Sequence, residues 1–399
     1  PTGQGTIQNP YRICTAEQLQ EMNNGTYDKK HYRLGRSIDL TNSASWFGGK
    51  WFNPVGRDIY AGFSGSLDGN GFEIQNLTTK SSEDYVGLFG AAQGAAYAGV
   101  WIHNLKLSNV LIQNPGNISG GLAGMLGCAV VDGVEISNMD MQGVKSSSGG
   151  IAGYTWYDTK ILYSKAQGSI STADTAAISA IGGIAGYTPG GPLELAYTES
   201  DITINAKAGN IWGLVWHAYG GSTAATNLSI HDNVVKGSIT VRDGSYGAVG
   251  GMLWNATYVH AENNVTDAGN NQIMIEGDGT VGYVGGFVGL SGSSDYIHNS
   301  TTYGIQWNTA GYIGGFGGHM GGWLASKNSA TGAIGGENGT GPRSLLIGGF
   351  VGGANYGKFY DNYSTSEISL SQDAAAAYVG WFAGGVGGAE LRRNYSTGI

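Results

Sequence analysis

A glycine-rich cluster of five residues recurs ten times along the chain, and it limits the possible folds more than any other feature. Typical copies read "GGLAG", "GGIAG" and "GGFVG", and successive copies end 29 to 38 residues apart. Repeats of this length are typical of solenoids, in which each repeat forms one coil. The ten copies end at Gly90, Gly124, Gly153, Gly186, Trp216, Trp254, Gly289, Gly318, Gly352 and Gly384.

Asparagine recurs between the clusters, each time after a short strand-like segment such as "FEIQN". Stacked asparagines can hydrogen-bond amide to amide from one coil to the next. Each repeat also holds a third short segment, such as "GSIT", and no helical periodicity. The pattern predicts an all-β fold, a right-handed parallel β-helix of about ten coils. The recurring asparagines are Asn76, Asn104, Asn138, Asn233, Asn264, Asn299, Asn328, Asn362 and Asn394.

The first 80 residues lack the repeat. In "CTAEQLQEM", Thr15 is suited to cap a helix and Gln18 stands at the capping-box position, so a short helix is expected here. We expect residues 1–80 to form an N-terminal capping segment that covers the open end of the core, and residues 81–399 to form the solenoid. The chain starts without a signal peptide and stops within a repeat, so we expect other domains in a larger chain.

Charge and composition exclude several partners. The formal net charge is -9, with only 20 Lys and Arg, so a nucleic-acid partner is not expected. No apolar run is long enough for membrane insertion. Cys14 and Cys128 have no metal or disulfide spacing.

Two parts of the chain resemble a known family. The clusters "GGLAG" and "GGFVG", followed by "NS" or "NYSTG", are similar to the GLUG-motif repeats of bacterial surface adhesins and of regions that precede IgA-specific metallopeptidase domains. The opening "NPYRICTAEQL" and "FSGSLDGNGFEIQNL" resembles the segment that often precedes such repeats. The resemblance implies a β-solenoid that is secreted or on the cell surface, and it leaves the activity open.

Strand alternation predicts which cluster positions face the core. Position three is always a sizeable hydrophobe, such as Leu122 or Phe316, and is expected to point inward. Positions two and four would then point outward and form a flat floor of glycine, alanine and valine. Aromatic and polar residues follow this floor, in an arrangement typical of carbohydrate grooves. The expected binding residues are Tyr154, Trp156, Tyr187, Trp216, His217, Tyr219, Trp254, Asn255, His319 and Trp323.

Two interpretations of these aromatic residues remain open at the level of the sequence. They can contact a ligand, or they can pack under a loop or at a corner of the coil. Trp216 and Trp254 replace the last glycine of their clusters, and they either fill a wider core or emerge beside His217.

Catalytic chemistry would require a pair of carboxylates in the same groove. The candidates are Asp158, Glu194 and Asp295, each shortly after a cluster, with Asp158 and Glu194 on neighbouring coils. The seven histidines form no metal motif, and no cofactor is expected. A structural calcium ion in a turn is compatible with the sequence but has no identifiable ligands.

The sequence supports three candidate functions. The first is a bacterial β-solenoid that binds a polysaccharide or cell-surface glycan along an aromatic-lined face, as an adhesin or as the substrate-binding body of a larger protein. The second is a glycoside hydrolase acting in the same groove. The third is a structural spacer without a ligand.

Overall fold

In the computed structural model the chain is all-β, as the repeats predict. The structure describes residues 1–23, 29–49, 51–57, 59–80, 83–94, 99–113, 115–173, 180–189, 191–207, 210–215, 218–219, 228–242, 247–267, 269, 272–276, 281–308, 310–336, 345–370 and 377–397. Within these ranges it is a parallel β-solenoid of about nine turns, and we describe its two compact units separately. Unit 1 is Pro1–Thr188 with Leu193–Ile202, and unit 2 is Pro189–Pro192 with Thr203–Ile399.

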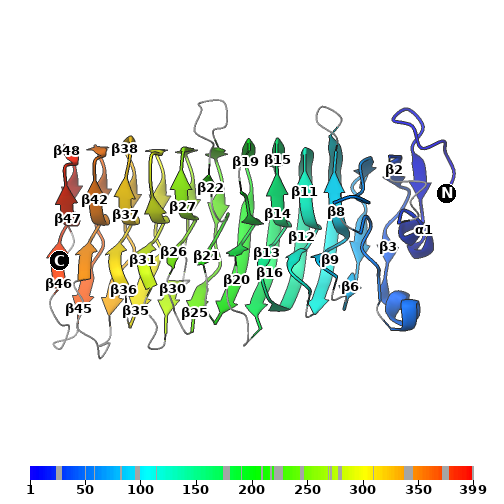
Figure 1. Cartoon of the computed structure of the whole chain (residues 1–399), viewed down its shortest axis with the longest axis horizontal. Coiled ribbons are helices and arrows are strands. Elements are labelled where there is room, and N and C mark those ends of the chain that lie inside the picture. Colours follow the sequence, from blue (N-terminus) through cyan, green and yellow to red (C-terminus); the bar gives the residue numbers. More distant parts are fainter. Residues whose placement is uncertain are drawn as a thin grey trace. The chain divides into compact units, whose positions relative to one another are not determined.

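From Tyr85 onward, the coils of unit 1 contribute strands to three parallel sheets, whose stacking Figure 1 shows. We call the strand before each glycine cluster the leading strand, the one after it the trailing strand, and the rest of the coil the large sheet. The leading strands are β7 (Tyr85–Val86), β10 (Ile118–Gly120), β13 (Ser147–Gly149) and β17 (Ala180–Gly182). The trailing strands are β8 (Phe89–Gln93), β11 (Ala123–Gly127), β14 (Ala152–Trp156) and β18 (Ala185–Tyr187). The large sheet holds β1 (Tyr11–Ile13), β2 (His31–Leu34), β3 (Ile38–Asp39), β4 (Ser66–Asp68), β5 (Glu73–Gln75), β6 (Thr78–Thr79), β9 (Val100–Gln113), β12 (Ala129–Val144), β15 (Thr159–Leu162), β16 (Lys165–Thr172), β19 (Leu193–Ala196) and β20 (Glu199–Ala206). The boundary between the two units falls inside β20, after Ile202.

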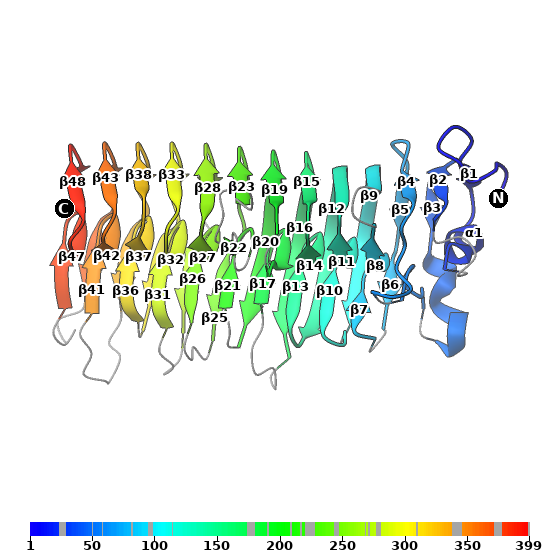
Figure 2. The ribbon, with the colours of Figure 1, turned by 45° about the horizontal axis from the view of Figure 1, so that its top comes forward.

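Unit 2 repeats this plan, and Figure 2 shows its leading and trailing strands as two rows, which belong to two sheets. The leading strands are β21 (Asn210–Trp212), β26 (Ala248–Gly250), β31 (Val281–Gly285), β36 (Ala310–Gly314), β41 (Leu345–Gly348) and β46 (Ala377–Gly380). The trailing strands are β22 (Ala218–Tyr219), β27 (Leu253–Thr257), β32 (Val288–Ser291), β37 (Gly317–Gly321), β42 (Val351–Asn355) and β47 (Ala383–Gly387). The large sheet holds β23 (Leu228–His231), β24 (Val234–Val235), β25 (Ile239–Val241), β28 (Val259–Glu262), β29 (Val265–Thr266), β30 (Gln272–Ile275), β33 (Asp295–Ile297), β34 (Ser300–Thr301), β35 (Gly304–Trp307), β38 (Leu324–Ser326), β39 (Ser329–Ala330), β40 (Ile334–Gly336), β43 (Lys358–Tyr360), β44 (Tyr363–Ser364), β45 (Ile368–Leu370), β48 (Glu390–Arg392) and β49 (Tyr395–Ser396).

The N-terminal segment contains the expected helix. Helix α1 (Ala16–Glu21) begins after Thr15, whose hydroxyl accepts a hydrogen bond from the Gln18 backbone N–H at 3.2 Å. The Gln18 side chain accepts one from the Cys14 backbone N–H at 2.7 Å, so the side chains of Thr15 and Gln18 together cap the first turn. A 3-10 helix, η1 (Thr41–Gly48), comes next. Within the described residues no helix has the length and apolarity needed to cross a membrane.

The glycine cluster forms a corner between the leading and trailing strands, and this corrects the predicted outward floor. Leu122 and Ala123, at positions three and four, are both fully buried, as are Ile151 and Ala152. The residues at positions two and three form a bend rather than a strand, so strict alternation does not carry through the cluster. Position four therefore belongs to the core and provides no outer surface for a ligand.

Close backbone approach explains why the corner requires glycine. A Cβ atom at Gly124 would lie 2.7 Å from the Val86 backbone nitrogen, and one at Gly318 would lie 2.7 Å from that of Val284. The trailing strand thus touches the leading strand of the preceding coil, with no room for a side chain between them.

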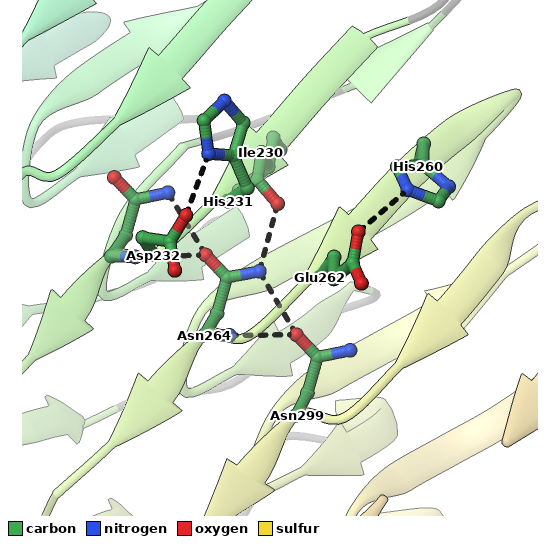
Figure 3. A network of polar contacts seen from close by, with 8 residues as sticks. Ile230, His231, Asp232, His260, Glu262, Asn264 and Asn299 are labelled. Atoms are coloured by element: carbon green, nitrogen blue, oxygen red, sulfur yellow. Dashed lines mark hydrogen bonds and ion pairs between the residues drawn. The ribbon is translucent and has the colours of Figure 1, made fainter. Parts of the chain in front are cut away.

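The predicted asparagine ladder is confirmed in unit 2, where its buried members bond from coil to coil (Figure 3). The Asn264 side-chain amide donates to Asn299 Oδ1 at 2.9 Å and to the Ile230 carbonyl oxygen at 2.8 Å. Equivalent side-chain bonds join Asn233 to Asn264, Asn299 to Asn328, Asn328 to Asn362, and Asn362 to Asn394. These bonds satisfy amides that burial would otherwise leave unpaired.

Unit 1 has a different, exposed ladder of Asn76, Asn109 and Asn138, which have left-handed backbone angles and are joined by side-chain bonds of 3.0 and 3.3 Å. The prediction was wrong for Asn104, whose amide instead contacts His103 Nδ1 at 2.9 Å.

Candidate functional site

Three of the predicted binding residues come together on the trailing strands of unit 1. The Tyr154 and Trp156 rings stack with centroids 5.6 Å apart and planes at 19°, and Tyr187 meets Tyr154 edge-on at 5.3 Å. Tyr157 adds a fourth ring, 5.2 Å from Trp156. We call Tyr154, Trp156, Tyr157 and Tyr187 the aromatic cluster.

Alternation along β14 places the Tyr154 and Trp156 rings on one side of the strand. Thr155, between them, is buried on the other side, where its hydroxyl lies 2.6 Å from that of Thr188. Tyr154 pairs in register with Tyr187, and Trp156 pairs with Gly127, which has no side chain. The rings remain half-buried, and Tyr157 is 56% exposed. The cluster therefore combines fixed rings with an accessible edge.

The Tyr154 hydroxyl is kept neutral by its surroundings. Burial raises its pKa well above the ordinary value of 10, and the nearby phenol groups of Tyr187, Tyr85 and Tyr157 add to the effect. The group can donate a hydrogen bond to a ligand hydroxyl throughout the physiological pH range.

The predicted carboxylates do not form a free pair beside these rings. Glu194 is bound to the Lys160 ammonium group at 2.7 Å, and this hydrogen bond is the main cause of a raised pKa at Lys160. Asp158 is exposed, one residue before β15. Asp295 belongs to unit 2, where burial raises the pKa of its carboxyl group and His260 partly opposes the shift. A catalytic role for these three residues stays a prediction.

A second group of rings lies in unit 2, around the predicted residue His319. Tyr283 and Tyr312, from neighbouring leading strands, meet the imidazole edge-on at 5.7 and 5.4 Å. Asn355 lies 2.9 Å from His319 Nε2. Sequence reasoning missed both tyrosines, although the repeated "GYVGG" and "GYIGG" place them at equivalent positions of consecutive coils.

His319 makes the stability of unit 2 depend on pH. Burial lowers the pKa of its imidazole below 6.5 in the folded unit. The unfolded chain therefore binds a proton at this residue more readily than the folded unit does. Stability is retained above pH 6.5 and falls as the pH drops below it. We expect His319→Gln to reduce the difference in melting temperature between pH 7.5 and 5.0. An unchanged difference would contradict this assignment.

The other predicted binding residues are dispersed or lie outside the described part. Trp254 is half-buried and packs against the fully buried Trp212, with ring centroids 6.0 Å apart. Trp323 is 54% exposed and contacts Tyr258 edge-on at 5.8 Å. The backbone of Asn255 pairs with Leu290. Trp216 and His217 lie outside the described residues, as does the side chain of Tyr219 in β22.

Two imidazole–carboxylate pairs lie on the large sheet of unit 2 (Figure 3). His231 Nδ1 is 2.9 Å from Asp232 Oδ2, and His260 Nε2 is 3.4 Å from Glu262 Oε2. Across the described residues, no three His, Cys, Asp or Glu side chains are placed to hold a metal ion.

The fold and site define a parallel β-solenoid with clustered aromatic side chains beside its glycine corners. No protein-family model matches the chain. It is 36% identical over 147 residues to halomucin of Haloquadratum walsbyi, and 30% identical over 137 residues to a protein of Evansella cellulosilytica provisionally described as a Gly-rich membrane protein. Each match covers 34% of this chain, but only 2% and 15% of the two relatives.

A solved structure from Bacteroides ovatus, provisionally described as an immunoglobulin A1 protease, shares the fold. Its TM-score is 0.50 with 18% sequence identity, and the alignment covers 73% of this chain and 86% of that one. This likeness concerns the β-solenoid fold.

Proposed function

We propose that the chain is the glycan-binding β-solenoid of a secreted or cell-surface bacterial protein, and that it holds its ligand at the aromatic cluster. The observation that carries the proposal is the stacked, half-exposed pair of Tyr154 and Trp156, extended to the next coil by Tyr187. Sugar C–H faces pack on such rings, and neighbouring polar groups bind the hydroxyls.

The charges near the cluster favour binding over catalysis. A glycosidase requires two carboxyl groups free to act on one bond. Here the Glu194 carboxylate is occupied by Lys160 at 2.7 Å. Surface location is supported by the resemblance to adhesin repeats and by the relative described as a membrane protein. The other domains of the whole protein would then determine the biological consequence of binding.

The proposal is tested by affinity electrophoresis in gels that contain soluble polysaccharides. We expect a polysaccharide to retard the wild-type protein and Trp156→Ala to weaken binding about tenfold or more, as loss of a central aromatic contact does. Trp101→Ala is the matched control, because Trp101 is a 48% exposed tryptophan of unit 1 that stacks on His103 and lies on the large sheet, not on the trailing strands β14 and β18.

The same samples are assayed for release of reducing ends. If the wild-type protein releases reducing ends and Glu194→Gln abolishes that release, the function is hydrolysis and not binding alone. Equal retardation of wild type and Trp156→Ala would exclude the aromatic cluster as the binding site, and no retardation by any polysaccharide would favour a structural spacer.

A further inference from the structure

A cavity of about 540 Å³ opens on the large sheet of unit 2, among β30, β35, β40 and β45. This volume falls within the range of sites that bind small ligands. Two consecutive glycines, Gly335 and Gly336, create it in the strand that lies between β35 and β45. Gly335 pairs in register with Gln306 on one side and with Ser369 on the other, but has no side chain of its own. A Cβ atom at Gly335 would meet no atom within 4 Å.

Trp307 belongs to the apolar part of the lining, together with Met274, Ile275 and Leu370. Its ring lies against Gly336, where an added Cβ would be 2.5 Å from Trp307 Cζ2 and 3.0 Å from Nε1. The residue is only 7% exposed, and its indole N–H has no hydrogen-bond partner within the described part of the chain.

The polar lining indicates what kind of molecule the cavity takes. Gln306, Ser369 and Glu276 supply donors and acceptors, and no lysine or arginine is among the described lining residues. Glu276 would repel an anionic ligand, whereas hydroxyl groups can donate to its carboxylate and bond to the Gln306 amide. An aromatic ring beside several hydroxyl-binding groups suits a sugar.

We propose that this cavity is a binding site for a neutral saccharide unit, with Gln306, Ser369 and Glu276 bonding to its hydroxyl groups and the edge of the Trp307 ring packing against its C–H groups. The site is built wholly within unit 2 and does not depend on the aromatic cluster of unit 1. If both sites bind, the chain holds a glycan at two separate places.

The test monitors the indole N–H signal of Trp307 by NMR in the full chain labelled with ¹⁵N-tryptophan. Trp307→Phe identifies the signal by its disappearance. Cellohexaose, xylohexaose and mannohexaose are the neutral probes, and hexagalacturonate is the acidic one. We expect at least one neutral probe to shift the signal in a saturable way and hexagalacturonate to leave it unmoved.

Gly335→Phe fills the cavity and is expected to weaken the response at least tenfold. Gly304→Phe is the matched control on β35, because a Cβ at Gly304 makes only ordinary contacts of 3.4 and 3.9 Å and the residue does not line the cavity. If Gly335→Phe fails to fold, Trp307→Phe takes its place in the test. Its saccharide binding is measured by calorimetry, and we again expect an affinity at least tenfold weaker than that of wild type.

Trp156→Ala separates this proposal from the proposed function, because it should leave the Trp307 titration unchanged whether or not polysaccharide retardation is lost. The proposal is overturned if no neutral probe moves the signal, if hexagalacturonate moves it equally, or if the cavity-filling variant binds like wild type.

Discussion

Replacing Gly318 by valine is expected to destabilise unit 2 by about 3 kcal/mol or more, as overpacking against immovable backbone does. A Cβ at this position would lie 2.5 Å from the Gly289 carbonyl oxygen and 2.7 Å from the Val284 nitrogen. Both atoms belong to strands hydrogen-bonded on each side, so neither can move without breaking the stack.

Gly335→Ala is the control for this substitution, since its Cβ would enter open space. We expect a change within about 0.5 kcal/mol, as for other surface positions. Urea denaturation measured by circular dichroism compares both variants, and hydrogen exchange localises the loss because solenoids do not always unfold in one step. Equal midpoints for Gly318→Val and wild type would contradict the close-approach explanation of the repeat.

The second large effect is expected for Asn299→Ala in the buried ladder. The Asn299 side chain donates to Asn328 Oδ1 at 3.0 Å and to the Ala261 carbonyl oxygen at 2.9 Å. Its Oδ1 accepts from the backbone and side-chain nitrogens of Asn264 at 3.0 and 2.9 Å. Because truncation leaves several buried groups unpaired, we expect a loss of about 3 kcal/mol or more.

Asn109→Gly provides the comparison in the exposed ladder of unit 1. Asn109 has a left-handed φ of 53°, which glycine adopts without strain, and water can replace its side-chain bonds. We expect a loss of about 1 kcal/mol or less. Hydrogen exchange of the backbone amides beside each site measures both losses of stability. Similar losses at the two sites would show that burial does not determine how much an asparagine ladder stabilises the protein.

Local patterns in the sequence predicted the elements that depend on neighbouring residues. The glycine period indicated the parallel coils, and Thr15 with Gln18 indicated the start of α1. The buried asparagines from Asn233 onward were also foreseeable, because the same residue type recurs at one place in consecutive coils, where its side chains can stack.

Contacts between coils were harder to predict. The outward floor failed because the cluster is a bend, so Ala123 points into the core beside Leu122. His319 meets Tyr283 and Tyr312 only because a trailing strand folds back beside two leading strands. The cavity at Gly335 likewise depends on how the Trp307 ring turns against Gly336, which no local pattern specifies.

A glycan bound on the aromatic cluster would shield its rings from solvent, and hydroxyl-radical footprinting measures that shielding. The protein is oxidised with and without a polysaccharide that retards it, and oxidation is measured on each peptide by mass spectrometry. We predict protection of the peptides that carry Trp156 and Tyr187 and unchanged oxidation at Trp101, which is 48% exposed. Undiminished oxidation of Trp156 and Tyr187 in the presence of bound polysaccharide would contradict binding at the aromatic cluster.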